Sequence, residues 1–214
     1  MNYIYKILVA DDEPQMNATV NVYKKLLKHR YNLDVEFKVI NTEAEYDETE
    51  SFDILMVDYN LARGFYDHSE KVLGDEFIKK FRSKNSISLV IFYSSEFEYN
   101  EKDGHYVFPY AKKEIYELIN DLRVDKISSR NNSDMMINVI KQCCEELDVF
   151  ALIISKQVQK YLDNDIEATF TLNDGSEISL LNLLHELKID SDKGRDFRKS
   201  VLETVFTTIL NIKY

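Results

Sequence analysis

Acidic side chains follow two short apolar runs of the chain, at places where they could carry out chemistry. Asp11, Asp12 and Glu13 come directly after one run, and Asp58 comes directly after another. Carboxylates that lie close together repel, and each raises the pKa of its neighbour unless a cation lies among them. Mg²⁺ accepts a few carboxylates while keeping several waters, and an Asp beside it can attack a phosphoryl group because the metal neutralises charge on the transferring oxygens. If the fold brings these acids together, the chemistry they favour is Mg²⁺-dependent phosphoryl transfer to a carboxylate.

Up to about residue 123, the chain alternates between short apolar runs and amphipathic stretches. Runs in which successive residues are apolar are typical of strands buried on both faces. Strand–helix alternation predicts an α/β fold, here a doubly wound five-stranded parallel sheet with helices on both faces, in which ligands bind at the carboxyl ends of the strands. The predicted strands are 7–10, 35–40, 54–57, 89–93 and 105–108, and the predicted helices are 14–29, 42–50, 74–82 and 113–123.

This order of elements places the acids at one edge of the sheet, together with the hydroxyl groups of Ser94 and Ser95 after the fourth predicted strand. A single acidic residue after a strand is most simply a solvated loop residue. Here an acidic pair follows the first strand, Asp58 follows the third and two hydroxyls follow the fourth. That coincidence favours a site over three unrelated loops.

Several stretches form one pattern, made of Ile7-Leu8-Val9-Ala10-Asp11-Asp12-Glu13-Pro14, Ile54-Leu55-Met56-Val57-Asp58, Val90-Ile91-Phe92-Tyr93-Ser94-Ser95, a later Gly74 that opens a helix, and Pro109 after the predicted fifth strand. The pattern resembles the receiver domains of two-component response regulators. The resemblance covers roughly residues 4–124 and nothing beyond. It implies a flavodoxin-like receiver and a signalling switch that takes a phosphoryl group from a histidine kinase or a phosphotransfer protein.

The resemblance also implies a role for individual residues. Asp58 would be the phosphoacceptor. Mg²⁺ would be held by the carboxylates of Asp11, Asp12 and Asp58 and by the backbone carbonyl of Asn60. Ser94 would contact the phosphoryl group after its transfer.

The chain departs from the family pattern in two places. The family has a Lys directly before the proline that follows the fifth strand, where it pairs with the phosphoryl group, and the predicted strand puts Phe108 at that position. Lys112, Lys113 or Arg63 is a candidate substitute cation. Arg63 lies in the loop 59–73, which is longer than in the family. This loop could be a lid, a partner site or a tolerated surface insertion.

The family also has an aromatic switch residue near the end of the fifth strand. On the predicted strand 105–108, that residue falls at His105 or Tyr106. Tyrosine occurs 14 times in the chain, so an aromatic side chain at this point carries little weight.

The pattern changes after residue 124. The polar segment 125–134 is predicted to be a linker, and residues 135–214 are predicted to form a smaller, mostly α-helical output or interaction domain. The apolar helix faces of this part are expected to form a core, and an apolar excess could serve a homodimer or a protein partner. The predicted elements are a helix at 135–162, a strand at 167–172, a turn at 173–175 and helices at 179–187 and 197–212.

Composition excludes several classes of protein. The net charge is −11, and residues 125–214 hold 11 Lys and Arg against 15 Asp and Glu, so neither part has the basic footprint of nucleic-acid binding. No stretch approaches the roughly 20 apolar residues that cross a bilayer, and the N-terminus lacks a secretory signal, so we expect a cytoplasmic protein without membrane contact. Four scattered histidines and the adjacent Cys143 and Cys144 offer no zinc spacing.

Three functions compete at this stage. The first is a phosphorylation-dependent switch whose output passes through protein–protein contacts. The second is a pseudo-receiver that binds partners without phosphorylation, which Phe108 favours. The third is an enzyme such as a Mg²⁺-dependent phosphatase with an aspartyl nucleophile. That enzyme needs a second carboxylate two residues after Asp58, where Asn60 stands, so we expect no enzyme of this kind.

Overall fold

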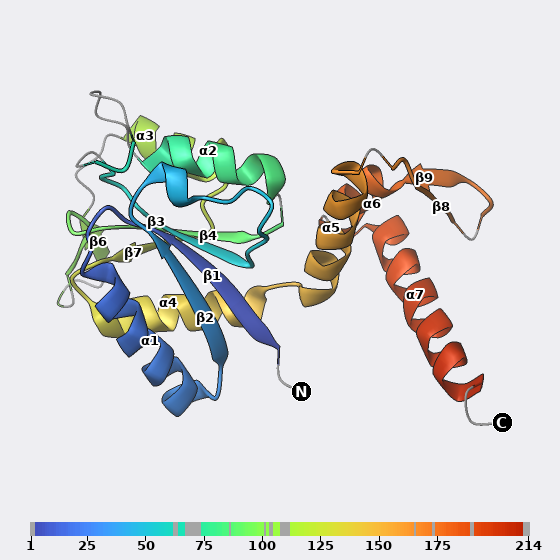
Figure 1. The fold of residues 1–214 in the computed structure, drawn as a ribbon, viewed down its shortest axis with the longest axis horizontal. Coiled ribbons are helices and arrows are strands. Elements are labelled where there is room, and N and C mark those ends of the chain that lie inside the picture. The colour runs from blue at the N-terminus through green and yellow to red at the C-terminus, as the bar shows by residue number, and fades with distance from the viewer. Residues whose placement is uncertain are drawn as a thin grey trace. The chain divides into compact units, whose positions relative to one another are not determined.

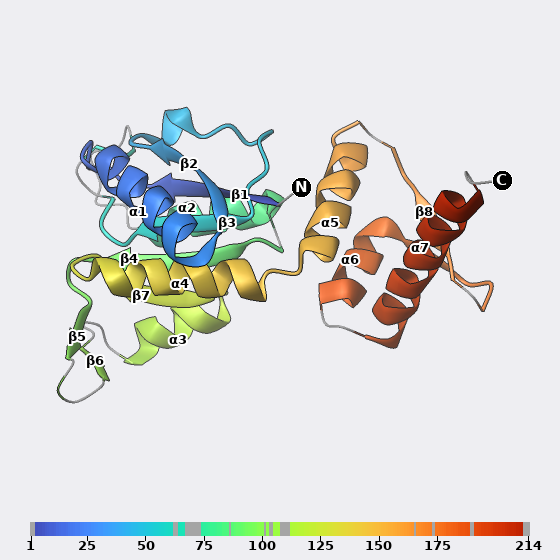
Figure 2. The same cartoon turned by 90° about the horizontal axis from the view of Figure 1, so that it is seen from below.

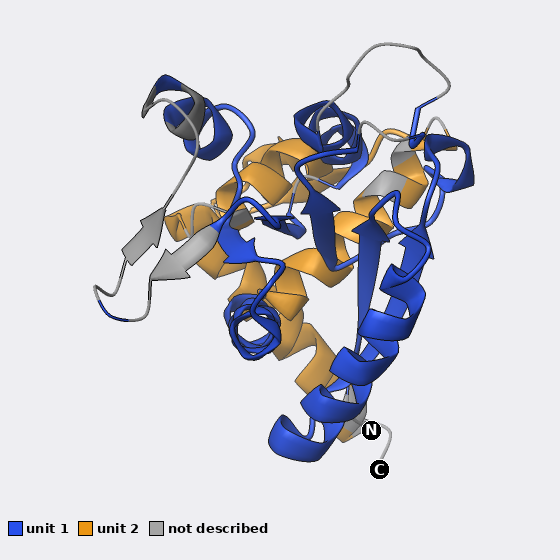
Figure 3. Ribbon diagram, turned by 90° about the vertical axis from the view of Figure 1, so that its left-hand side faces the viewer, with its two compact units in different colours: residues 1–147 blue, residues 148–214 orange. Residues whose placement is uncertain are grey.

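The computed structural model has two compact units, Met1–Leu147 and Asp148–Tyr214, which Figure 3 distinguishes by colour. Among the residues it describes, no helix is both long enough and apolar enough to cross a membrane. The described residues are 3–61, 64–66, 74–85, 87–100, 102, 105–107, 112–164, 166–172, 174–188 and 191–211.

A five-stranded parallel sheet forms the centre of the first unit (Figure 1). Its order is β2-β1-β3-β4-β7, which is the flavodoxin-like arrangement with its reversal of strand order between β1 and β3. The predicted fold class is therefore confirmed. The strands are β1 (Ile4–Ala10), β2 (Asp34–Ile40), β3 (Ile54–Asp58), β4 (Leu89–Ser94) and β7 (Lys126–Ser129).

Helices cover both faces of this sheet. In Figure 1, α2 (Gly74–Lys84) and α3 (Lys112–Asn120) lie on one face, while α1 (Met16–Tyr31) and α4 (Ser133–Glu146) lie on the other. Figure 2 shows the second pair from its own side. Successive side chains of a strand point to opposite faces, so each strand contributes to two cores. Leu8, Leu55 and Phe92 are buried in the core with α2 and α3, and Ile7, Met56 and Ile91 are buried in the core with α1 and α4.

The segment between β2 and β3 does not form the helix predicted at 42–50. It contains η1, a single turn of 3-10 helix at Glu43–Glu45. Five of the nine residues in 42–50 are acidic, and like charges three or four positions apart destabilise a helix. The buried side chain that anchors the segment is Tyr46, whose ring meets Phe77 edge-on at 5.1 Å. One buried ring does not supply the apolar stripe that stabilises a surface helix.

The fifth strand of the sheet is not the predicted segment 105–108. Residues His105–Val107 form β6, which pairs antiparallel with β5 (Glu98–Asn100) in a separate two-stranded sheet. The place of the fifth strand is taken by β7, which runs parallel to β4 with Ser129 opposite Ser94. The four residues of β7 include one apolar side chain, so β7 lacks the run that marks the other central strands.

The boundary between the units also differs from the prediction of a domain at 1–124 and a linker at 125–134. Residues 125–134 contain β7 and the start of α4, and α4 packs on the sheet of the first unit. The predicted helix 135–162 is two helices, α4 and α5 (Val149–Leu162). They are separated at Asp148, whose side chain accepts a hydrogen bond from the backbone N–H of Ala151 at 3.0 Å and so caps the start of α5.

The second unit is mostly helical, as predicted. Its hairpin turns at Gly175, whose φ of 82° lies in the left-handed region that favours glycine. Phe197 packs edge-on against Phe170 at 4.8 Å and ties the last helix to the hairpin. Besides α5, the unit contains β8 (Thr169–Thr171), β9 (Glu177–Ser179), α6 (Leu180–Lys188) and α7 (Asp192–Asn211).

Candidate functional site

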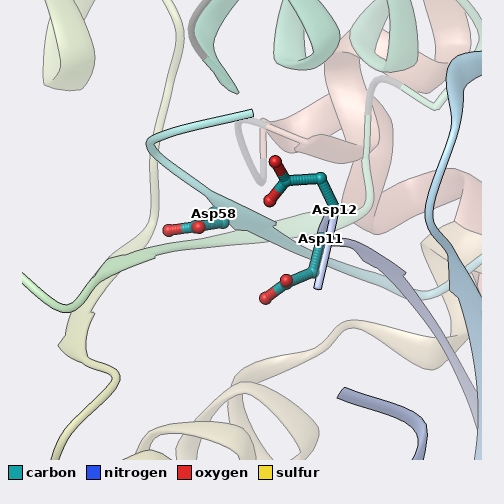
Figure 4. Close-up of side chains that lie close together, drawn as sticks. All are labelled: Asp11, Asp12 and Asp58. Atoms are coloured by element: carbon teal, nitrogen blue, oxygen red, sulfur yellow. The ribbon is translucent and has the colours of Figure 1, made fainter. Parts of the chain in front are cut away.

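Three carboxylates meet at the carboxyl ends of two neighbouring strands. Asp11 and Asp12 follow β1, Asp58 ends β3, and Ala10 lies directly opposite Val57 in the sheet. Each Asp offers one oxygen, and these oxygens all lie within 4.8 Å of one another (Figure 4). Asp11 and Asp58 are buried and Asp12 is half-buried. The predicted convergence of these three side chains is therefore present in the structure.

The carboxylate of Asp11 is held in one orientation by two donors. The hydroxyl of Tyr93 donates to Oδ2 at 2.6 Å, and the backbone N–H of Glu13 donates to Oδ1 at 2.9 Å. Burial raises the pKa of Asp11, and both hydrogen bonds oppose that rise. Sequence reasoning missed Tyr93 because it stands within an apolar run, where an aromatic ring looks like part of the core.

The pKa of Asp58 is raised to about 7, first by burial and next by the charge of Asp11. Arg130 and the backbone N–H of Asn60 act in the opposite direction. A nearby positive charge stabilises the ionised form of a carboxyl group whose pKa is raised in this way. The oxygen donors of the three acids suit a small hard ion such as Mg²⁺, and the surplus of negative charge at the site favours one.

Arg130 is a second residue of this cluster that sequence reasoning missed. It directly follows β7, and its guanidinium reaches Glu13 at 2.8 Å, Asp11 at 3.3 Å and Asp58 at 3.4 Å. Its backbone N–H donates to the carbonyl of Ser94 at 3.0 Å. It was missed because residues 105–108 have the local pattern of a last strand and β7 does not. No local signal in the sequence marks it, because β7 has a single apolar residue and reads as part of a polar linker.

Ser94 ends β4 next to this site. Tyr93 lies opposite Asp58 in the sheet, so Ser94 lies one position beyond it toward the carboxyl edge. The hydroxyl of Ser94 is buried and accepts the backbone N–H of Glu96 at 3.1 Å. The neighbouring Ser95 is exposed. The position suits the predicted contact with a phosphoryl group, and that role stays a prediction, as does the metal contact of the Asn60 carbonyl.

Of the other predicted cations, the structure describes the side chain of Lys113 alone. Lys113 is an exposed residue that pairs with Glu117 at 3.4 Å on its own helix. Lys112 begins α3, and its side chain lies outside the described part of the chain. Arg63 and Phe108 lie outside the described residues as well. Because β6 is not a strand of the parallel sheet, the prediction of a fifth strand at 105–108 that ends at Phe108 is wrong.

The two residues predicted to be the aromatic switch do not lie on the fifth strand of the parallel sheet. His105 and Tyr106 belong to β6, in the separate hairpin, and their side chains lie outside what the structure describes. The same spacing counted back from Arg130 falls on Ile127 and Ser128, neither of which is aromatic. The prediction that His105 or Tyr106 lies on the fifth strand of the parallel sheet is therefore wrong, while a switch role for either residue stays a prediction.

The predicted loop 59–73 is anchored in the core where the structure describes it. Phe65 is buried and packs edge-on against Phe77 at 5.3 Å, and its carbonyl accepts the backbone N–H of Glu43 at 2.7 Å. This point of the loop lies on the side of α2. Phe65 is therefore part of the packing against α2.

Gly74 sits against the backbone of the phosphoacceptor candidate. Its N–H donates to the carbonyl of Tyr59 at 2.8 Å, and a Cβ at this position would overlap the carbonyl oxygen of Asp58. We expect Gly74→Ala to lower the free energy of unfolding by roughly 2–3 kcal/mol, because the backbone must shift to relieve the overlap. Urea unfolding measures the loss, and amide exchange should show it at β3.

The matched control is Gly194→Ala in the second unit. A Cβ there would lie 2.5 Å from the carbonyl oxygen of Glu186, so the steric conflict is of the same kind. In Gly194→Ala, amide exchange should become faster in α6 and α7 and stay unchanged in β3. Unchanged exchange at β3 in Gly74→Ala would show that the start of α2 moves away from Asp58 without cost.

Comparisons with known proteins found similar chains among solved structures. No protein-family model matches the chain, and a search of curated proteins finds no match. Among solved structures, it is similar to the BeF₃-activated DrrB receiver domain, with 16% identity and a TM-score of 0.46 over 67% of this chain and 100% of that one. A CheY-like receiver domain protein from Methanospirillum hungatei JF-1 gives 17% identity and a TM-score of 0.46 over 68% and 98%. A two-component transcriptional regulator from Clostridium phytofermentans ISDg gives 12% identity and a TM-score of 0.45 over 73% of this chain and 98% of that one.

Proposed function

We propose that this protein is a phosphorylation-dependent signalling switch in the cytoplasm, which accepts a phosphoryl group on Asp58 in the presence of Mg²⁺ and passes the change to a protein partner. The observation that carries the proposal is the meeting of Asp11, Asp12 and Asp58 within 4.8 Å, with Arg130 beside them. The phosphoryl donor would be a histidine kinase or a phosphotransfer protein, as the sequence resemblance implies.

Each residue of the site has a separate task in this proposal. An oxygen of Asp58 forms the new bond to phosphorus as the bond between phosphorus and the donor breaks. Asp11, Asp12, Asp58 and the Asn60 carbonyl would hold Mg²⁺, which neutralises charge on the transferring oxygens when bound. Arg130 supplies the cation that the family takes from a Lys, because it lies 3.4 Å from Asp58 at the end of the fifth strand.

Arg130 also weakens the case for a pseudo-receiver. That alternative depended on Phe108 at the family's Lys position. With β7 as the fifth strand, Arg130 would take that position, which supports the switch. Arg donates several N–H groups in a planar fork that matches a phosphoryl group, so it is a competent replacement for Lys. The switch is therefore the better supported of the two functions.

The output is proposed to be a protein contact of the second unit. Residues 125–214 carry more acidic than basic side chains, which disfavours binding to duplex DNA. Exposed apolar side chains on α7 offer a surface for a partner or for a homodimer. They are Leu202, Val205, Phe206 and Leu210.

The direct test is covalent modification of Asp58. With Mg²⁺ and a small phosphodonor, the wild type should gain the mass of one phosphoryl group, and Asp58→Asn should gain none. Asp75→Asn is the matched control, because Asp75 lies in the first turn of α2 outside the cluster and should leave the modification intact. BeF₃⁻ with Mg²⁺ should also slow amide exchange at β4 and β7. A wild type that takes up no label and ignores BeF₃⁻ would defeat the proposal.

A further inference from the structure

The guanidinium of Arg130 lies among carboxylates that come from two different strand ends. Its Nη2 atom is 2.8 Å from Glu13 and 3.3 Å from Asp11, and its Nη1 atom is 3.4 Å from Asp58. The side chain is 18% exposed, so these contacts are partly shielded from water. Contacts of this kind between buried or half-buried groups are screened less than pairs on the surface.

Two of these carboxylates belong also to the proposed metal site. Asp11 and Asp58 are shared between Arg130 and the trio that could hold Mg²⁺, whereas Asp12 belongs to the trio and Glu13 is the closest contact of Arg130. A guanidinium and a divalent ion on the same two carboxylates would lie a few ångströms apart. Their repulsion disfavours simultaneous occupancy.

The structure offers Arg130 a place to withdraw. The contact with Glu13 is the shortest of the three, and the Glu13 side chain is 35% exposed, so it is in contact with solvent, whereas the Asp11 and Asp58 side chains are 0% and 7% exposed. The backbone of Arg130 is held by its hydrogen bond to the Ser94 carbonyl at 3.0 Å. The side chain can therefore move while its attachment point stays in place.

We propose that Arg130 is a tethered cation that competes with Mg²⁺ for Asp11 and Asp58, and that Mg²⁺ binds as the guanidinium withdraws toward Glu13. This inference builds on the proposed function, because it assumes that the three aspartates bind the metal. The coupling is reciprocal, so Mg²⁺ also releases Arg130 from Asp58 and leaves it available to an arriving phosphoryl group. Arg130 is a positioning residue in this step.

The test is calorimetric titration of the full chain with Mg²⁺ at pH 9, where protons do not compete for the acids. Arg130→Gln should bind Mg²⁺ about tenfold more tightly than the wild type, because a neighbouring positive charge is removed. Arg130→Lys keeps the charge and should stay near the wild type. Lys126→Gln removes a charge from the other end of β7, where Lys126 pairs with Glu146 at 2.8 Å, and should change nothing.

A second measurement uses the wild type and does not depend on the folding of a variant. The side-chain N–H signals of Arg130 in an ¹⁵N NMR spectrum, assigned by their loss in Arg130→Lys, should shift on addition of Mg²⁺. Equal affinity in wild type and Arg130→Gln, or Arg130 signals that ignore a bound metal, would overturn the competition while the metal site stands. If even Arg130→Gln binds no Mg²⁺, the competition and the metal site both fail.

Discussion

A fragment that ends at Leu147 is expected to fold, whereas a fragment that ends at residue 124 is expected to be unfolded. The shorter fragment loses β7, which leaves β4 without its neighbour, and it loses α4. Full burial of an apolar side chain contributes roughly 1.5–3 kcal/mol, so the lost helix removes on the order of 10 kcal/mol, which is comparable to the whole stability of a domain. The buried side chains of α4 are Met136, Ile137, Val139, Ile140, Cys143 and Cys144.

Circular dichroism and thermal melting of the two fragments decide this prediction. Residues 1–147 should show a cooperative transition, and residues 1–124 should show none. The matched control keeps the full length and replaces Ile137 and Ile140, both buried in α4, by Ala, which should lower the free energy of unfolding by about 4 kcal/mol or more. A cooperative transition in residues 1–124 would restore the boundary predicted from sequence and make α4 part of the second unit.

The second large effect is a pH-dependent stabilisation by Asp58→Asn. The pKa of Asp58 in the folded protein is about 7, above the ordinary value of 3.8 for an Asp. The folded state therefore favours the protonated form. The stability that the protonated Asp58 contributes to the folded state is fully present below about pH 4 and is lost as the pH rises toward 7. At pH 8 the ionised carboxyl destabilises the fold, whereas the amide in the Asp58→Asn variant carries no such charge.

We expect Asp58→Asn to raise the free energy of unfolding by roughly 2–4 kcal/mol at pH 8 and to change it little at pH 4. The variant also loses the contact with Arg130 at 3.4 Å, which lowers its free energy of unfolding. The net gain is therefore smaller than the pKa shift alone would give. Urea unfolding in the presence of EDTA at pH 4, 6 and 8 measures the difference. Mg²⁺ should stabilise the wild type at pH 8 and reduce the difference in the free energy of unfolding between the wild type and Asp58→Asn.

Asp121→Asn serves as the control, because Asp121 is exposed and lies away from the three acids. Its effect on stability should be small and nearly the same at all three pH values. An Asp58→Asn variant whose stability follows that of the wild type from pH 4 to pH 8 would show that folding does not raise the pKa of Asp58. The repulsion inferred among the three acids would then be absent.

Local sequence predicted the central part of the fold and the three aspartates. β1, β3 and β4 are buried on both faces, so their residues are apolar in succession and can be recognised without knowledge of their neighbours. Once strands alternate with helices, the rules for parallel sheets bring the carboxyl ends of β1 and β3 to one edge. Asp11, Asp12 and Asp58 meet there for that reason.

The fifth strand and its arginine were decided by tertiary structure alone. β7 has one apolar residue, and it is a strand because it pairs with β4, with Ser129 opposite Ser94. Likewise, the apolar face of α4 looks the same in sequence whether it packs on this sheet or within a second domain. Backbone pairing and helix docking are long-range contacts, and local composition does not encode their partners. The cation beside Asp58 could therefore be identified as Arg130 only after the chain was folded.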